Sequence, residues 1–249
     1  MCGRYTLRTS PAEVAKAFRL AGIVDFPPRY NIAPTQKVFA IMAEAAEQDA
    51  ARHASPQPDR DREPHQRKFA PLHWGLIPSW AADPSVASRM INARAETVAT
   101  KPAYRQAFAR RRCLIVADGF YEWRKLGPGK QPYYIHLADG GPFAFAGLWE
   151  HWQRGELTID SCTIITTAAN ALLATLHDRM PVILPPEQHD LWLDPAVTEF
   201  ARVLPLLAQY PADEMALEPV STLVNSPRND SPACLAPVDE DAPPAGYLF

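Results

Sequence analysis

Short apolar runs separated by turn residues constrain the fold of this chain more than any other feature. Many of them carry β-branched or aromatic residues between Gly, Pro or Asp, which is typical of strands. The expected strands cover 3–8, 37–42, 69–75, 113–119, 121–125, 131–137, 143–149, 159–167, 180–184 and 216–221, and the expected helices cover 101–110, 169–175, 186–193 and 196–208. Strands outnumber helices and do not alternate with them regularly, which disfavours a doubly wound parallel sheet. The sequence therefore predicts an α+β fold with a mainly antiparallel, curved or barrel-like β-sheet core and flanking helices.

Two other segments help to divide the chain. Ser10-Pro11-Ala12-Glu13 is a capping box with proline at the first helical position, so a helix is expected to begin there. Residues 51–68 hold three prolines and eight charged residues but no aromatic or branched aliphatic residue. Such a stretch cannot bury enough apolar area to offset its ordering entropy, which predicts an exposed, mobile insertion. We expect one domain over 2–226 and an extension or tail over 227–249.

Composition excludes several classes of protein. The chain has 249 residues, of which 47% are apolar and 21% are charged, and its net charge is −3. These values are typical of a globular protein without a global positive field for nucleic acid, although Arg105 and the run Arg110 to Arg112 leave room for a local basic groove. The alternative for that run is a solvated helix end. The apolar runs are too short for a membrane helix and the N-terminus has no signal-peptide core, so a cytoplasmic protein is expected.

The cysteines and histidines give no sign of a metal site or of a disulfide framework. The four cysteines stand at 2, 113, 162 and 234 without paired spacing, and no two histidines have ligand spacing. The chain also lacks a phosphate loop and a dinucleotide fingerprint. No cofactor is expected.

Cys2 is the most informative single residue for function. If Met1 is removed, Cys2 carries an α-amine and a thiol on adjacent carbons, with ordinary pKa values of about 8 and about 8.5. Such a 1,2-aminothiol condenses with an aldehyde to an imine, and the thiol then closes a five-membered thiazolidine. The alternative is that Cys2 is simply a residue at the start of a strand.

Three polar residues that lie within largely apolar segments of the sequence are candidates to assist Cys2. Asn92 can orient an amine through its donor and acceptor, or it can cap a helix. Glu122 lies between aromatic residues that would raise its pKa into a range useful for proton transfer, unless it sits on an exposed strand face. His177, in the motif LHDRMP, is the strongest of the seven histidines as an acid or base, although a lone histidine is more often structural.

Arginine and tryptophan are the candidate DNA-contacting residues. Arg94, two residues after Asn92, can contact a phosphate in a bidentate manner. Trp74 and Trp80 flank a Gly/Pro bend and can form a platform on which bases stack, or they can belong to the core.

Eight motifs in order along the chain resemble the SOS-response-associated peptidase (SRAP) family. They are MCGRY at the N-terminus, RYNIAPTQ (29–36), WGLIPSW (74–80), INARAET (91–97), CLIVADGFYEW (113–123), GLWE (147–150), TIITTAAN (163–170) and LHDRMPVIL (176–184). The resemblance covers residues 2 to 226. Relative to the pattern of the family that the chain resembles, the segment 51–68 looks like an insertion.

The resemblance implies an abasic-site sensor. Met1 would be removed by self-processing, and Cys2 would form a thiazolidine crosslink with the ring-opened abasic site in single-stranded DNA, shielding the lesion during the DNA damage response. Asn92, Glu122 and His177 match the remaining active-site positions of the family, and its DNA contacts match Arg4, Arg94, Trp74, Trp123 and Thr166. The resemblance also implies an autopeptidase with an abasic-site lyase side activity. The expected partner is single-stranded DNA containing abasic sites, bound by a monomer in the nucleoid without a metal or a membrane.

Three rival functions remain open from the residues alone. N-terminal-nucleophile glutamine amidotransferases also begin Met-Cys-Gly, and there the cysteine attacks an amide, which would release ammonia. A non-covalent single-strand binding module would use arginine and stacking only, and its affinity would vanish with salt. A general peptidase acting on other proteins would pair His177 with Cys2.

Overall fold

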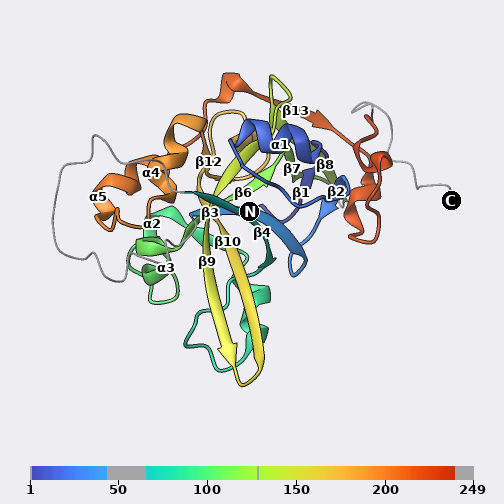
Figure 1. Ribbon diagram of the computed structural model, residues 1–249. Coiled ribbons are helices and arrows are strands. Elements are labelled where there is room, and N and C mark those ends of the chain that lie inside the picture. The colour runs from blue at the N-terminus through green and yellow to red at the C-terminus, as the bar shows by residue number, and fades with distance from the viewer. Residues whose placement is uncertain (1, 44–65, 128, 239–249) are drawn as a thin grey trace.

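Five strands close into a β-barrel at the centre of the molecule (Figure 1). The computed structural model describes residues 2–43, 66–127 and 129–238. The barrel strands are β3 (Lys37–Ala43), β4 (Arg67–Trp74), β6 (Arg112–Ala117), β9 (Phe143–Arg154) and β10 (Leu157–Ala168). Each neighbouring pair is antiparallel except β4 and β10, which run parallel and meet only at Ser161–His73 and Cys162–Trp74. The predicted barrel-like, mainly antiparallel core is confirmed.

Three short strands extend the barrel sheet. β5 (Asn92–Arg94) runs parallel to the end of β10, and β11 (Arg179–Pro181) runs antiparallel to the same end. β12 (Ile183–Leu184) pairs with β9. The far end of β10 therefore lies between the strand that carries Asn92 and the strand that follows His177.

A second, five-stranded sheet brings the N-terminal strand next to the strand that carries Glu122. Its order is β13 (Met215–Pro219), β8 (Gly129–Leu137), β7 (Gly119–Leu126), β1 (Tyr5–Leu7) and β2 (Arg29–Ile32). Tyr5 pairs with Phe120, and the Tyr121 N–H donates to the Arg4 carbonyl over 3.0 Å. Since β1 and β7 are antiparallel, Glu122 faces the first residues of the chain.

The helices are short and lie around the two sheets. They are α1 (Pro11–Ala17), α2 (Ala95–Val98), α3 (Arg105–Arg110), α4 (His189–Leu193) and α5 (Phe200–Val203), with 3₁₀ turns η2 (Pro84–Arg89), η3 (Leu173–Thr175), η4 (Pro186–Gln188), η5 (Leu204–Leu206), η6 (Ala212–Glu214), η7 (Thr222–Asn225) and η8 (Pro232–Leu235). The expected capping box is present, because Ser10 accepts from the Glu13 N–H and Glu13 accepts from the Ser10 N–H. Within the described ranges, no helix is long and apolar enough to cross a membrane.

Two expected helices are wrong in extent. In 169–175 only Leu173–Thr175 forms a 3₁₀ turn, and the Asn170 carboxamide oxygen accepts the Leu173 N–H over 2.9 Å in place of a longer helix. In 196–208, α5 ends at Val203 and a 3₁₀ turn follows. Pro205 has no N–H to continue the helical hydrogen bonds, which explains that end.

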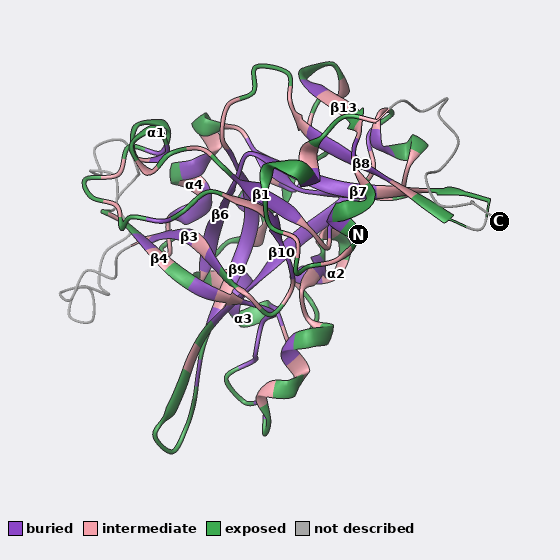
Figure 2. Ribbon diagram, turned by 90° about the vertical axis from the view of Figure 1, so that its right-hand side faces the viewer, coloured by how far each residue is buried: buried purple, intermediate pink, exposed green. Residues whose placement is uncertain are grey.

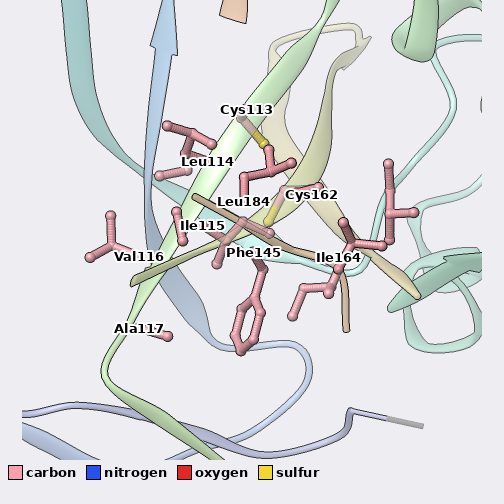
Figure 3. Packing of buried hydrophobic residues seen from close by; sticks show 14 of the residues in the cluster. Cys113, Leu114, Ile115, Val116, Ala117, Phe145, Cys162, Ile164 and Leu184 are labelled. Carbon is pink, nitrogen blue, oxygen red and sulfur yellow. The ribbon is translucent and has the colours of Figure 1, made fainter. Parts of the chain in front are cut away.

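The barrel interior is filled with apolar side chains (Figure 3). Every residue of β6 is buried, and Cys113 and Ile115 pack beside Phe145 and Cys162. Gly147 is required on the neighbouring strand, because a Cβ there would lie 2.9 Å from Cys113 Sγ. Figure 2 shows this buried centre, whereas the far end of the β9–β10 hairpin is exposed.

The arginine run 110–112 is only partly available to a ligand. Arg112 is buried, donates to the carbonyls of Phe108 and Trp192, and lies over the Trp192 ring. Burial lowers the pKa of Arg112 to about 10. Arg111 pairs with Glu150 over 2.8 Å. The alternative of a solvated helix end is therefore wrong for Arg112, which lies buried at the start of β6, whereas it fits Arg110, the exposed last residue of α3.

The expected insertion and the expected tail both lie partly outside the described residues. Of the segment 51–68, residues 51–65 lie outside the described residues, whereas Arg67 belongs to β4 and donates to the Phe18 carbonyl over 2.6 Å. The first part of the tail is packed against the domain. Asp230 accepts the N–H groups of Tyr30 and Asn31 over 2.6 and 3.0 Å, and Cys234 is buried. Residues 239–249 lie outside the described residues.

Candidate active site

Cys2 lies at the start of the N-terminal strand and is fully buried. The Asn92 Nδ2 donates to the Cys2 carbonyl over 2.9 Å, and the Asn92 Oδ1 is buried without a hydrogen-bond partner among the described residues. Asn92 belongs to β5 and does not cap a helix, because Arg94 stands at the N-cap of α2. The Tyr104 hydroxyl donates to the Asn92 carbonyl over 3.3 Å. The Asn92 Nδ2 thus fixes the backbone of Cys2, while the Asn92 Oδ1 remains available as an acceptor.

The environment of Cys2 keeps its thiol protonated. Burial raises the pKa of the Cys2 thiol, and the negative charge of Glu122 raises it further. The thiol lies 4.0 Å from the Arg4 carbonyl oxygen. In this structure Cys2 therefore carries a neutral thiol next to a carboxyl group.

Glu122 is a buried carboxyl group on β7, with 7% of its surface exposed. Burial raises the pKa of Glu122, while the positive charge of the chain's amino terminus acts in the opposite direction. The exposed-strand alternative for Glu122 is therefore wrong. A carboxyl group with a raised pKa next to the chain start is suited to accept and return a proton.

His177 lies between η3 and β11, and its ring is about one-third exposed. Its Nδ1 accepts the Arg179 N–H over 3.0 Å and lies 2.8 Å from Asp178 Oδ1. The two contacts favour opposite tautomers, because the backbone N–H needs a bare Nδ1 whereas the Asp178 carboxylate favours a proton there. The backbone contact is the fixed one of the two, since the Asp178 side chain is 85% exposed and can turn away into solvent. Burial lowers the pKa of His177, and the amino-terminal charge lowers it further. The neutral ring therefore carries its proton on Nε2.

Arg4 and Trp123 lie against the C-terminal segment. The Arg4 Nη1 donates to Asn31 Oδ1 and to the Val224 carbonyl, each over 2.7 Å. The Trp123 Nε1 donates to Asn225 Oδ1 over 2.7 Å, and its ring is half-buried. The segment that follows β13 thus fixes two of the expected DNA-contacting side chains.

The remaining expected DNA contacts differ in their access to solvent. Arg94 is exposed. Thr166 is fully buried, and its hydroxyl donates to the Ala93 carbonyl over 3.3 Å. Trp74 is also fully buried, with its Nε1 donating to the Ile91 carbonyl over 3.0 Å, whereas Trp80 is 63% exposed. The core alternative therefore holds for Trp74, and neither Trp74 nor Thr166 offers a side chain to a nucleotide in this structure.

Two charged residues beside the site were not predicted as functional residues from the sequence. Arg179 and Glu96 form a bidentate ion pair with distances of 2.6 and 3.0 Å. Each stands inside a motif that carries a candidate residue, Glu96 four positions after Asn92 and Arg179 two positions after His177. Their opposite charges inside two of the eight motifs were the available signal. Among the described residues, no group of three His, Cys, Asp or Glu side chains is placed to hold a metal ion.

These features define an α+β barrel protein in which a buried cysteine at the second position meets an asparagine and a glutamate from two other strands. The chain belongs to the SOS response associated peptidase (SRAP) family, whose model matches residues 1–227.

Named relatives match most of the chain. The abasic site processing protein YoqW of Bacillus subtilis is 40% identical over 93% of this chain and 97% of its own length. The abasic site processing protein YedK of Escherichia coli is 31% identical over 84% of this chain and 85% of its own length. A crystal structure of a Bacteroides thetaiotaomicron protein superimposes with a TM-score of 0.76 at 24% identity, covering 95% of this chain and all of the other. That structural likeness supports the fold.

Proposed function

We propose that this protein processes abasic sites in single-stranded DNA by capturing them covalently at Cys2, once Met1 has been removed by self-processing. The observation that carries the proposal is the meeting of Cys2 with Asn92 and Glu122. The names of the relatives, which are abasic site processing proteins, supply the substrate class. An abasic site contains a masked aldehyde, and an aldehyde is the natural reaction partner of a 1,2-aminothiol.

The proposed reaction has three balanced steps. The deoxyribose ring opens when the proton of its C1 hydroxyl is removed and the ring oxygen is protonated, which frees the aldehyde. The Cys2 α-amine then condenses with the aldehyde to an imine and releases one water. Finally the Cys2 sulfur bonds to the imine carbon, and the thiol proton moves to the imine nitrogen. No oxidant or reductant is required.

The environment of each side chain supports a distinct role. The unused Asn92 Oδ1 is an acceptor for an N–H of the Cys2 amine. Glu122, whose pKa is raised by burial, is suited to move the proton that opens the sugar ring. His177, with its proton on Nε2, is the donor for the water that leaves during imine formation. The raised pKa of the Cys2 thiol fits the order in which the amine reacts first.

Exposed or half-buried cations and aromatic rings supply the proposed DNA contacts. We assign these contacts to Arg94, Trp123 and the exposed Trp80, together with Arg4, whose Nη1 is held by Asn31 and by the Val224 carbonyl. A net charge of −3 means that attraction to phosphates must be local. Trp74 and Thr166 act through the packing of the site in this proposal.

A denaturing gel of the protein mixed with single-stranded DNA that carries one abasic site tests the proposal. A heat-stable adduct is expected with the natural protein, and none is expected with Cys2→Ala, which keeps the other three cysteines. Borohydride-reduced abasic DNA is the matched substrate control, because it lacks the aldehyde. Cys2→Ser is expected to lose the stable adduct while its imine can still undergo β-elimination and cut the strand.

Intact mass measures the processing step independently. The crosslinking form is expected to have lost the mass of one methionine residue. A heat-stable adduct with Cys2→Ala, or with protein that retains Met1, would exclude the aminothiol mechanism.

A further inference from the structure

The ion pair between Arg179 and Glu96 joins the segment that follows His177 to the segment that follows Asn92. The Nη1 and Nη2 of Arg179 contact the two carboxylate oxygens of Glu96 over 2.6 and 3.0 Å. Glu96 lies in the first turn of α2, directly after the strand that carries Asn92. Arg179 begins β11 and is only 12% exposed in its side chain. The proposed chemistry uses neither side chain.

The same guanidinium also contacts the strand between these two segments. The Arg179 Nη2 donates to the Thr166 carbonyl over 2.6 Å, and Thr166 pairs with Arg94 on β5 and with Pro181 on β11. One side chain of β11 therefore contacts both β10 and the first turn of α2. A planar guanidinium with several fixed donors is suited to such a joint.

The backbone of Arg179 reaches His177 directly. Its N–H donates to His177 Nδ1 over 3.0 Å, so a shift of Arg179 moves the hydrogen bond that orients the imidazole. The Asp178 carbonyl accepts the Ala169 N–H over 3.0 Å, which ties the same loop to the end of β10. The position and the tautomer of His177 thus depend on where Arg179 is held.

We propose that Glu96 and Arg179 form a positioning pair that holds His177 in register with Asn92 and keeps the imidazole proton on Nε2. This inference rests on the proposed function, because it gives the pair a role in the same reaction. Neither residue touches the reacting atoms. Neutralising Glu96 releases one side of the guanidinium, allows the Arg179 backbone to shift, and loosens the imidazole. A displacement of about 1 Å in a reacting group can cost about 100-fold in rate.

Glu96→Gln tests the pair against a matched control. Arg67 and Asp190 form an ion pair with the same shortest distance of 2.6 Å and with similar exposures, 10% and 56%, against 12% and 52% for Arg179 and Glu96. Asp190→Asn therefore removes an equivalent charge away from the site. The crosslinking rate of Glu96→Gln is expected to fall about 10- to 100-fold with a changed pH profile, while Asp190→Asn keeps the natural rate.

Two further measurements separate a positioning role of the pair from a role in DNA binding. The affinity of Glu96→Gln for unmodified single-stranded DNA is expected to be at least that of the natural protein, since a negative charge has been removed. The imidazole ¹⁵N spectrum of His177 is expected to show loss of the single Nε2–H tautomer in Glu96→Gln and its retention in Asp190→Asn. A natural rate, pH profile and tautomer in Glu96→Gln would overturn the proposal, as would an equal loss of rate in Asp190→Asn.

The spectrum needs no DNA, so the two proposals fail separately. If the natural protein formed no adduct, the proposed function would be wrong, and the tautomer measurement would still decide whether the pair positions His177.

Discussion

Asn92 donates from Nδ2 to the carbonyl of Cys2 over 2.9 Å, while its Oδ1 lies buried with no hydrogen-bond partner among the described residues. A buried acceptor without a partner is costly, so such a group usually has a use. The contact fixes the backbone of Cys2, and the free oxygen is in place for a donor that the chain start would supply after processing.

Substitutions of Asn92 separate these two functions. Asn92→Asp keeps the size of the side chain but sets a carboxylate oxygen against the Cys2 carbonyl, so the crosslinking rate is expected to fall further than in Asn92→Ala. Losing one hydrogen bond costs about 1 kcal/mol, and leaving a buried acceptor without its partner costs about 1–3 kcal/mol, which the facing carboxylate oxygen increases. Single-turnover gels with abasic single-stranded DNA provide the rates. Equal rates in the natural protein and in Asn92→Asp would contradict the assigned donor role.

Glu122→Gln is expected to stabilise the protein at neutral pH while reducing its activity. Burial raises the pKa of Glu122, so the folded state binds the proton more tightly than the unfolded state does. For such a group, stability falls as pH rises from the ordinary glutamate pKa to the raised one, and the loss persists above that. Glutamine mimics the protonated form and avoids that loss. The gain in melting temperature should vanish below about pH 4, where Glu122 is protonated in both states.

Calorimetry at several pH values measures this gain, and the gel assay measures the activity. A gain in melting temperature that stayed constant down to pH 3 would show that proton binding by Glu122 is not its cause.

Trp74 and Trp80 stand six residues apart in one motif, but their replacement by alanine should affect different properties. Trp74→Ala should lower stability, and Trp80→Ala should lower DNA affinity. Trp74 is fully buried and meets the Tyr5 ring edge-on at 5.3 Å, so its loss is expected to cost about 3–5 kcal/mol of unfolding free energy. Trp80 is 63% exposed, so its loss should change stability by about 0.5 kcal/mol at most. If Trp80 stacks on a base, its loss weakens single-strand binding by about 1–3 kcal/mol.

Urea denaturation and fluorescence anisotropy measure the two quantities. An unchanged DNA affinity in Trp80→Ala would remove Trp80 from the proposed contacts.

The packed part of the C-terminal segment should matter for DNA binding through Arg4 and Trp123. Asp230→Ala removes the acceptor for the N–H groups of Tyr30 and Asn31, which is expected to cost about 1–3 kcal/mol of stability. The segment that holds Arg4 and Trp123 would then loosen, and single-strand affinity should fall. Ser231→Ala is the neighbouring control, because Ser231 is exposed and its side chain makes no capping hydrogen bond. Equal affinities in the two variants would show that the segment does not support the contacts.

The sequence predicted the main strands and the class of fold because period-two runs between turn residues are a local signal. The sequence also identified Asn92, Glu122 and His177 as candidates, since polar residues inside apolar segments have few purely structural uses. The structure places Asn92 and Glu122 at the start of the chain, and their chemical roles remain part of the proposal.

What the sequence could not predict depends on contacts between distant residues. The burial of Trp74 but not of Trp80 is set by how 75–91 folds back beneath β10, and no local pattern encodes it. The packing of 227–238 depends on Asp230 meeting β2, about 200 residues earlier in the sequence. The pairing of Glu96 with Arg179 likewise requires that β5 and β11 flank the same strand.

The parallel junction of β4 with β10 rests on two residue pairs, Ser161 with His73 and Cys162 with Trp74. The other neighbours in the barrel pair over longer stretches, and the β9–β10 hairpin is local in sequence. The two strands stand nearly ninety residues apart in the sequence, and their ladder holds only these two residue pairs. Ring closure is therefore expected late on the folding pathway, and amide exchange at this junction should report the first opening of the native protein.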